Sequence, residues 1–560
     1  MKKKKTRFLA LLLSALLTAA ALTGCTNSGS GTSSATNSSS TEESISSDTG
    51  TSSTVAAEAG EVALPIVDEP VTVTMWSPSA PDLTTIVDSY ADTAFFKRLA
   101  EETNVTIDFD MPALGNESQA FSLMIASNEL PDMIRTTMAV QYPGGLDAAI
   151  DDGYFLDLTD MIPELAPNYL KALERMDEFD LNIRRSAVTP SGRYGGICQL
   201  MYEPQGAYGG MYVRQDWLDE LGMDTPQTYE DWETMLTAFK DEMGATAPLL
   251  LYKTGYEGDF NSLSVGYGVT SSFYQEDGVV KFGPAEEGWR EYVTTMHDWY
   301  EKGLIDPDFM SSTSSSPIVP DTAMVTTGKA GAFAGMYISV AMWEESNTDP
   351  DAVYSPVYPP MQEAGEVSKF GNMPLAGAYM AISAKSEHAE TCLKLMDYFF
   401  SDAGYIDCNY GVEGETFEYV DGEPQFTELV TANDEMTFAQ AYSYYTVPPA
   451  WPVYQDWRRE LASVPEKDVV CYDVWSSFTK ENSMPRVTSL GMTQEDNVEY
   501  SRLMTDIQSI VDEKTAQFIS GAVSLDEYDA YLQQLDQMGL ADAITIVQNA
   551  YDSFMARDVG

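Results

Sequence analysis

Short apolar runs alternate with helical patterns where the folded part of the chain begins. Residues 71–76 form a β-branched run that ends in Trp, and residues 91–103 repeat their apolar side chains at helical spacing. A second β-branched run at 105–109, a helical pattern at 118–126 and a short apolar run at 131–134 follow. Strands that alternate with helices predict a parallel sheet with helices on both faces, and therefore an α/β fold.

Two later segments show where helices end and begin. The apolar residues of segment 217–221 recur at helical spacing, and Gly222 suits the left-handed position after a helix. Thr228 can cap the next helix, with Asp231 three residues on as a weak variant of the capping box. Both features predict how the fold is built and indicate no chemistry.

The first 60 residues follow a different pattern. Basic residues at 2–5 and 7 precede an apolar run of fifteen residues, 8–22, which is the layout of a secretory signal and is short for a membrane span. Residues 26–60 are mostly Ser, Thr, Gly, Asn and acidic residues, too poor in apolar side chains to fold. We expect a cleaved leader and a disordered tether.

The charge of the chain excludes one class of function. The formal net charge is −56, and no stretch rich in Lys or Arg exists outside the leader. A nucleic-acid-binding protein needs a basic surface to displace counterions, so we expect no nucleic-acid partner. The acidity favours neutral or cationic ligands, and it also serves solubility alone.

The cysteines and histidines indicate no metal centre. Besides Cys25 there are four scattered cysteines and no C-x-x-C pair, and the chain has 2 His. The calcium-loop pattern D-x-[DN]-x-[DN]-G is also absent. Buried thiols are the default, although a bridge between Cys392 and Cys408 is compatible with an exported protein. We therefore expect no metal and no cofactor.

Several motifs in chain order resemble one family. They are Leu-Pro-Asp-Met-Ile at 130–134, Gly-Tyr-Phe-Leu-Asp-Leu-Thr at 153–159, the segment 212–222, and Trp-Tyr-Glu-Lys-Gly-Leu-Ile-Asp-Pro at 299–307. Together they resemble extracellular solute-binding proteins of family 1, the substrate-binding lipoproteins of ABC transporters. The C-terminal stretch is similar to the long subgroup that carries LipO-type lipoproteins. The resemblance implies a two-lobed, periplasmic-binding-protein-like (type II) fold with hinge crossings.

The sequence Leu-Thr-Gly-Cys at 22–25 resembles the lipobox of bacterial lipoproteins. This resemblance implies that residues 1–24 are a signal peptide and that Cys25 carries a diacylglyceryl group with fatty-acyl chains such as palmitate. Residues 25–65 would then tether the protein to the extracytoplasmic face of the cell membrane. The alternative is an ordinary secreted protein in which Cys25 has no role.

The resemblance also predicts where the chain passes between the lobes. Crossings are expected near 200–208, where Pro204 and Gly206 give an extended or permissive backbone, near 357–371 and near 410–414. The predicted first lobe is 66–203 and 366–410, and the predicted second lobe is 204–365 and 411–560.

Candidate ligand-binding residues come from strand ends, crossings and the resemblance. Ligands of open α/β sheets lie beyond the carboxyl ends of strands, which selects Trp76 and Arg135. Tyr337 occupies the place where relatives similar to maltose-binding protein have a ring that stacks on the ligand. Each has a structural alternative in the core, in an ion pair or in a braced surface loop. The full set is Trp76, Arg135, Tyr208, Tyr337, Tyr379, Glu413 and Trp451.

These features together predict binding without catalysis. The chain has no G-x-S-x-G motif, and its many acidic residues make neighbouring carboxylate pairs uninformative, so we expect no catalytic residues. Aromatic rings and polar side chains suit sugars. We predict the solute-binding component of an ABC importer, with an oligosaccharide as ligand and permease subunits as partners. A cell-surface polysaccharide hydrolase and a tethered adhesin without a transport role are the alternatives.

Overall fold

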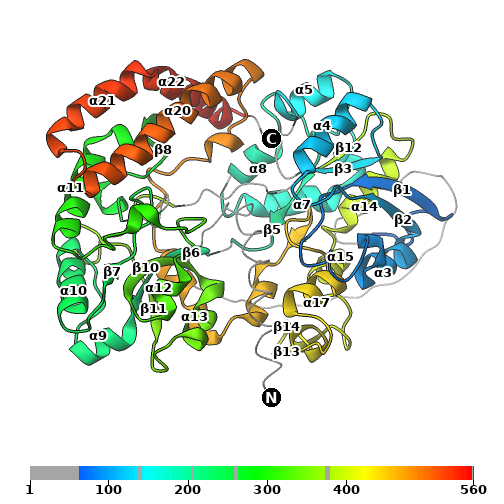
Figure 1. Ribbon diagram of the computed structural model, residues 1–560. Coiled ribbons are helices and arrows are strands. Elements are labelled where there is room, and N and C mark those ends of the chain that lie inside the picture. Colours follow the sequence, from blue (N-terminus) through cyan, green and yellow to red (C-terminus); the bar gives the residue numbers. More distant parts are fainter. Residues whose placement is uncertain are drawn as a thin grey trace, which may run out of the picture.

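Two separate sheets, each covered by helices, form two lobes that lie side by side (Figure 1). They are seen in a computed structural model of the chain. Cys25, the leader and the Ser/Thr-rich segment lie outside the described residues, so the anchor and the tether stay predictions. The structure describes residues 62–136, 142–180, 182–204, 206–257, 263–371, 377, 379–557 and 559.

The first lobe contains a five-stranded sheet in the order β2-β1-β3-β12-β4. β1 pairs in parallel with β2 and β3, as the alternating pattern predicted, whereas β12 is antiparallel to β3 and β4. The end of β4 and the start of β12 therefore lie at the edge where the parallel strands end. The strands are β1 (Val71–Trp76), β2 (Val105–Asp110), β3 (Met133–Thr136), β4 (Ile197–Cys198) and β12 (Tyr379–Ile382).

Alternating side chains of these strands enter two cores, one on each face of the sheet. Val73 and Met75 belong to one core, and Trp76 and Ile134 belong to the other. The helices of this lobe are α3 (Ala94–Thr103), α4 (Glu117–Ser127), α5 (Gly145–Asp151), α6 (Ile162–Leu165), α7 (Pro167–Met176), α8 (Asn182–Ala187), α14 (Ala389–Tyr398), α15 (Asp402–Asn409), α16 (Glu428–Thr431) and α17 (Phe438–Tyr445), with a hairpin of β13 (Phe417–Val420) and β14 (Glu423–Phe426).

The second lobe contains a four-stranded sheet in the order β11-β6-β10-β7. β10 is parallel to β7 and antiparallel to β6, so the start of β6 lies at the carboxyl edge of the other two. Every residue of β10 is buried, as expected for a strand covered on both faces. The strands are β6 (Gly209–Arg214), β7 (Ala247–Leu249), β10 (Ala330–Met336) and β11 (Tyr354–Val357).

The helices of the second lobe include the two whose ends the sequence marks. Gly222 adopts the left-handed C-cap conformation, and Thr228 forms a complete capping box with Asp231, so both predictions are confirmed. None of the helices in the described part of the chain is long and apolar enough to cross a membrane. This lobe contains α9 (Gln215–Leu221), α10 (Tyr229–Asp241), α11 (Glu287–Glu301), α12 (Thr322–Thr326), α13 (Val340–Ser346), α18 (Glu466–Val469), α19 (Cys471–Trp475), α20 (Gln494–Ile519), α21 (Tyr528–Gln537) and α22 (Leu540–Met555), with a hairpin of β8 (Phe273–Glu276) and β9 (Val279–Phe282).

Two crossings lie near the expected positions. The first runs between Leu200, which is in the first lobe's core, and Ala207, which is in the second lobe's. The return lies between Phe370 and Gly377, because Phe370 packs in the second lobe and the N–H of Gly377 donates to Gln199 O in the first. Gly206 was expected to give the crossing a permissive backbone. The structure shows that a glycine is needed there for close packing, because a Cβ would lie 1.9 Å from a ring carbon of Tyr472.

The last crossing differs from the expected position at 410–414. Residues 411–453 remain with the first lobe, whose core contains Val447, Trp451 and Val453. The chain leaves only after β15 (Tyr454–Gln455), which pairs in parallel with β5 (Leu200–Met201). The glycine-bounded turn at 411–414 instead opens the excursion that carries the β13–β14 hairpin, so the predicted boundary at 410 is too early. Local turn chemistry marks a change of direction and does not say which lobe follows.

Polar contacts also join the two lobes directly. The guanidinium of Arg557, which follows α22, donates to the carbonyl oxygens of Arg185 (2.8 Å) and Val188 (3.1 Å) in the first lobe. Lys480 Nζ lies 3.4 Å from Oδ2 of Asp180, and both side chains are largely buried. Side chains of the second lobe are therefore linked directly to groups of the first lobe in this state.

Candidate ligand-binding site

The second lobe has a hollow at the carboxyl end of β7. Its volume is about 190 Å³, and it is lined by residues 250–252 after the strand, by Glu257, by parts of segment 306–321 and by Phe333 of β10. We call it the β7 pocket. Ligands of open α/β sheets bind beyond the carboxyl ends of strands, so its position is that of a ligand site. Its volume is below the usual range of about 300 to 1,000 Å³, which suits one unit of a longer ligand.

The lining of the β7 pocket combines a ring with hydroxyl and carboxyl groups. Tyr252 is half-buried, and Ser312 and Thr313 contribute hydroxyls. Asp306 contributes a carboxyl whose pKa is raised, first by burial and also by the nearby charges of Asp308 and Asp321. None of the described lining residues is Lys or Arg. The pocket therefore offers an apolar ring face and hydrogen bonds, and no positive charge.

Glu257 is the most buried polar group of the lining. Its side chain belongs to a residue that is only 4% exposed, and Oε1 accepts a hydrogen bond from the N–H of Tyr252 (2.7 Å). Burial raises the pKa of Glu257 to about 8, although that hydrogen bond acts in the opposite direction. Near neutral pH the group is a carboxylic acid, which donates as well as accepts hydrogen bonds.

The segment 306–321, which lines the pocket, is held in place near its C-terminal end. Asp321 caps α12 by accepting from the N–H of Ala323 (2.9 Å). Ile318 lies against the start of β6, 3.2 Å from where a Cβ of Gly209 would be. Since β6 begins directly after the first crossing, the loop that forms one pocket wall lies beside the path between the lobes.

A chain of aromatic rings runs along the crossings. The ring of Tyr337, at the end of β10, packs edge-on against Tyr208 (centroids 5.0 Å apart) and against Tyr472 (4.9 Å). Tyr472 in turn contacts Trp457, which follows the last crossing strand (4.7 Å). Tyr337 is covered by its neighbours and only 1% exposed, whereas Tyr208 and Trp457 are half-buried. The rings with an accessible face are thus Tyr208 and Trp457.

The corresponding edge of the first lobe is closed. Arg135 is the third residue of β3, and its guanidinium donates to Ser77 Oγ (2.8 Å), Pro78 O (2.7 Å) and Ala450 O (3.0 Å). Its guanidinium also stacks on the Trp451 ring, 4.7 Å from the centroid. Arg135 is 5% exposed and Trp451 is fully buried, so this pair fixes a loop on the sheet and presents no free group.

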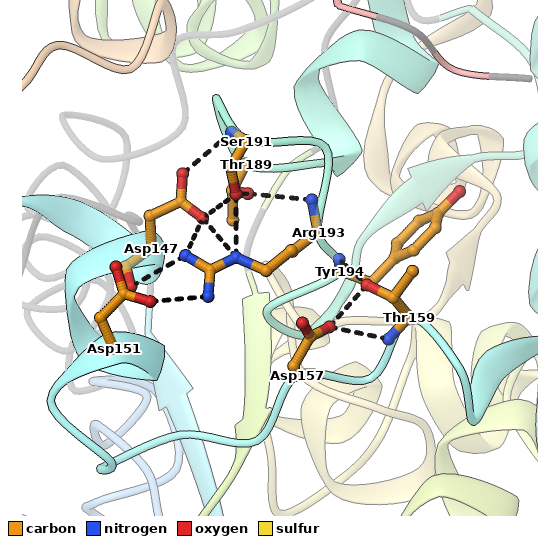
Figure 2. Close-up of polar contacts among 8 residues, drawn as sticks. All are labelled: Asp147, Asp151, Asp157, Thr159, Thr189, Ser191, Arg193 and Tyr194. Atoms are coloured by element: carbon orange, nitrogen blue, oxygen red, sulfur yellow. Dashed lines mark hydrogen bonds and ion pairs between the residues drawn. The ribbon is translucent and has the colours of Figure 1, made fainter.

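A second arginine near the first crossing is also engaged within the protein. Arg193 precedes β4, and Figure 2 shows its guanidinium between two acids of α5, with Oδ1 of Asp147 2.7 Å and Oδ1 of Asp151 2.8 Å away. Asp147 Oδ2 also accepts from the N–H of Ser191 (3.0 Å). This cluster holds the turn before β4 against α5. The presence of Arg193 is therefore explained by these contacts, and no ligand is needed to account for it.

The structure separates the predicted site residues into two groups. Tyr208 and Tyr337 lie together at the first crossing, where they were expected to meet a ligand. The others lie elsewhere: Trp76 is 1% exposed in a core, Arg135 and Trp451 form the closed edge, the Tyr379 hydroxyl donates to the carbonyl oxygen of Ser186, and Glu413 is exposed on a turn away from any crossing. Their structural alternatives, rather than ligand contacts, fit these positions.

The pocket residues were missed by sequence reasoning. Tyr252 could have been found, because it lies just beyond the carboxyl end of a strand, close to the position that selected Trp76 and Arg135. Ser312 and Thr313 carry no such signal, since only the tertiary structure brings their segment to the sheet edge. The four described cysteines, at 198, 392, 408 and 471, are all buried thiols, and the described residues contain no group of His, Cys, Asp or Glu arranged to hold a metal ion.

Comparison with known proteins places this architecture. The profile of the bacterial extracellular solute-binding protein family matches residues 80–406. The chain belongs to this family. It is 24% identical over 499 residues to the fructooligosaccharide ABC transporter substrate-binding protein FusA of Streptococcus pneumoniae, covering 82% of this chain and 87% of FusA. It is also 24% identical to the lipoprotein LipO of Bacillus subtilis, of whose length it spans 62%.

Solved structures show the same two-lobed, type II fold. The alginate-binding protein AlgQ2 matches with a TM-score of 0.62 and 22% identity, covering 87% of this chain and 99% of AlgQ2. An HMO-binding solute-binding protein from Bifidobacterium longum infantis matches with a TM-score of 0.65 and 18% identity, with the same coverage. These similarities establish the fold, and as a member of this family the chain is a solute-binding protein.

Proposed function

We propose that this protein is the carbohydrate-binding, membrane-anchored component of an ABC importer. The observation that carries the proposal is the β7 pocket, which lies at the carboxyl edge of a sheet in a solute-binding fold and offers a tyrosine ring beside hydroxyl and carboxyl groups. Sugars present apolar C–H faces to rings and hydroxyls to polar groups. The similarity to FusA, a fructooligosaccharide ABC transporter substrate-binding protein, supports an oligosaccharide as the ligand.

The proposed ligand path follows from the arrangement of the pocket and the rings. One sugar unit occupies the β7 pocket against Tyr252 and Glu257, and the following units extend toward Tyr208 and Trp457 at the crossings. Ligand held by groups of the second lobe and of the crossing segments favours one relative position of the lobes. A permease that recognises this position would take the ligand over.

A thermal-shift screen tests the binding part of this proposal. Residues 61–560 contain every described element, and a ligand that binds only the folded protein raises the unfolding midpoint by mass action. We expect a neutral oligosaccharide to raise the midpoint and Tyr252→Ala to reduce that rise, with Tyr419→Ala on the exposed β13–β14 hairpin as the matched control. Stabilisation by a peptide or polyamine, and by no sugar, would contradict the proposal.

The anchor is tested separately in cells. Two acyl chains on Cys25 would hold the receptor near its permease and raise its effective concentration there. We expect Cys25→Ala to leave ligand affinity unchanged and to lower uptake of the bound sugar. Equal uptake by the variant would show that anchoring is dispensable.

A further inference from the structure

We propose that the β7 pocket selects uncharged saccharides and rejects those that carry carboxylates, such as uronate oligosaccharides. This inference rests on the proposed carbohydrate function and narrows its ligand class. It follows from the acidic residues that line the pocket, from the contacts that three arginines make within the protein, and from the protonated form of Glu257.

Among the described residues, the lining of the pocket contains acidic groups and no basic group. Asp306, Asp308 and Asp321 contribute three aspartates, and Glu257 contributes a fourth, buried carboxyl that is protonated. Asp308 and Asp321 are close enough to Asp306 to raise its pKa. A carboxylate on the ligand would approach these groups without a compensating positive charge. Burying like charges next to one another is unfavourable, and recognition of carboxylates normally requires Arg or Lys.

Three arginines, Arg175, Arg458 and Arg135, are engaged by groups within the protein. Arg175 stacks on Tyr202, with its carbon 3.9 Å from the ring centroid, and it donates to Tyr202 O and to the Tyr454 hydroxyl. Arg458 makes two bonds to Asp456 (2.9 and 2.7 Å). Arg135 has its three donors on Ser77 and two carbonyl oxygens, as described above. None of these three arginines is among the lining residues of the pocket.

Lys253 is an exposed cation beside the pocket residue Tyr252, so the experiment that tests charge selectivity must include it. It directly follows Tyr252, is exposed, and holds its ammonium 5.4 Å from the centroid of the Tyr252 ring. It does not line the pocket. A cation in that position can reach a ligand that leaves the pocket, but it does not neutralise the acids inside it. We therefore assign it no part in selectivity.

Glu257 shows how a pocket of this charge can still hold a sugar tightly. As a buried, protonated carboxyl it offers both a donor and an acceptor to a hydroxyl, and it adds no charge that needs pairing. A ligand hydroxyl can satisfy both, whereas a ligand carboxylate satisfies only the donor. The pocket is thus matched to hydroxyls by hydrogen bonding as well as by electrostatics.

Matched pairs of ligands test the inference by calorimetric titration of residues 61–560. The pairs are galactotetraose against tetragalacturonate and mannotetraose against tetramannuronate, with inulin-type fructotetraose as a further neutral probe. We expect a neutral probe to bind and the uronates to bind at least about 100-fold more weakly, a factor typical of like-charge contact without counter-charge. Because surface charge is screened by salt and a buried mismatch is not, the difference should persist at high ionic strength.

A charge placed in the pocket should change this preference. Thr313 is an exposed lining residue, so Thr313→Lys adds a cation at little cost to folding. We expect it to tighten uronate binding at least about tenfold while neutral binding changes less. Thr322→Lys, on the exposed start of α12 outside the lining, is the matched control, and Lys253→Gln should leave the preference unchanged.

The outcomes separate this inference from the function on which it rests. Uronate binding as tight as that of the matched neutral sugar overturns the charge selectivity and leaves carbohydrate binding standing. Loss of uronate binding in Lys253→Gln would likewise overturn it, because the cation would then be part of the site. If no saccharide of either kind binds, the proposed function fails, and this inference fails with it.

Discussion

At the carboxyl end of its parallel strands, the first lobe has an arginine that is engaged by groups of the protein, whereas the second lobe has a hollow at the carboxyl end of β7. In the first lobe, Arg135 stacks on Trp451 and binds three protein oxygens. In the second lobe, the segments after β7 leave about 190 Å³ between Tyr252, Glu257 and segment 306–321. Sheets that both contain parallel strands therefore have two different edges, and the difference comes from which side chains the neighbouring segments bring.

Ligands of open α/β sheets lie beyond the carboxyl ends of strands. This contrast shows that the rule selects an edge of a sheet and not a binding site. Applied to the first lobe, it selected Trp76 and Arg135, which stabilise the fold. Applied to the second lobe, it selects residues next to a real hollow. The decisive property is whether a polar group at the edge already has protein partners.

The largest expected effect tests the closed edge. Trp451→Ala removes a fully buried ring and should lower the free energy of unfolding by about 3 to 5 kcal/mol, measured by chemical denaturation. The affinity of the variant for the ligand, measured without denaturant at a temperature where the variant is folded, should stay within about twofold of the parent's affinity. Trp457→Ala is the matched comparison, since its half-buried ring should affect affinity more than stability. The reverse pattern would place the ligand on the first lobe.

The next effect concerns Glu257 and pH. Its pKa of about 8 in the folded state lies above the ordinary value of 4.5, so the folded state binds the proton more tightly. The resulting stability is complete below pH 4.5 and is lost as pH rises through 8, with a fall of about 2 kcal/mol between pH 6 and pH 8. Glu257→Gln should remove this part of the pH dependence.

Unfolding curves of the parent and of Glu257→Gln across pH 5 to 9 provide the measurement. Asp397 and Asp407 also have pKa values raised to about 6, by burial, so the parent will lose stability over the lower part of this range for other reasons. The difference between the two proteins isolates Glu257. Parallel curves would mean that this carboxyl is ionised and that the pocket is wetter than its burial indicates.

A smaller effect is expected from the ring of the β7 pocket. Tyr252 is half-buried, so Tyr252→Ala should change stability little and weaken sugar binding by about 1 kcal/mol, or about fivefold to tenfold. Tyr252→Phe keeps the ring and should bind nearly as well. Titration calorimetry distinguishes the three proteins, and equal affinities for all of them would remove the ring from the site.

The smallest expected effect tests the ion pair that links the two lobes directly. Lys480 and Asp180 form a partly buried pair 3.4 Å apart, and Lys480→Met should lower stability by about 1 kcal/mol or less. If the pair restrains the lobes, the variant should also become more extended in solution scattering when ligand is absent. An unchanged scattering profile would limit the pair to a role in stability.

Much of the fold was predictable because it depends on short patterns. The first three strands, their parallel order and the caps at Gly222 and Thr228 follow from periodicity and local turn chemistry. The position of the last crossing was not predictable, because the turn at 411–414 has the same local sequence pattern whether the chain passes to the second lobe or stays in the first. Only the packing of Val447 and Trp451 into the first lobe decides it.

By itself the sequence determined the α/β class, the family motifs, the acidic surface and the prediction of a leader that ends at Cys25. These depend on composition and on residues close together in the chain. The tertiary structure alone decided that Arg135 and Trp451 close one sheet edge while Tyr252, Glu257 and Thr313 surround a hollow at the other. The reason is that the availability of a polar or aromatic group depends on partners far away in the sequence, and the pattern around the residue does not contain them.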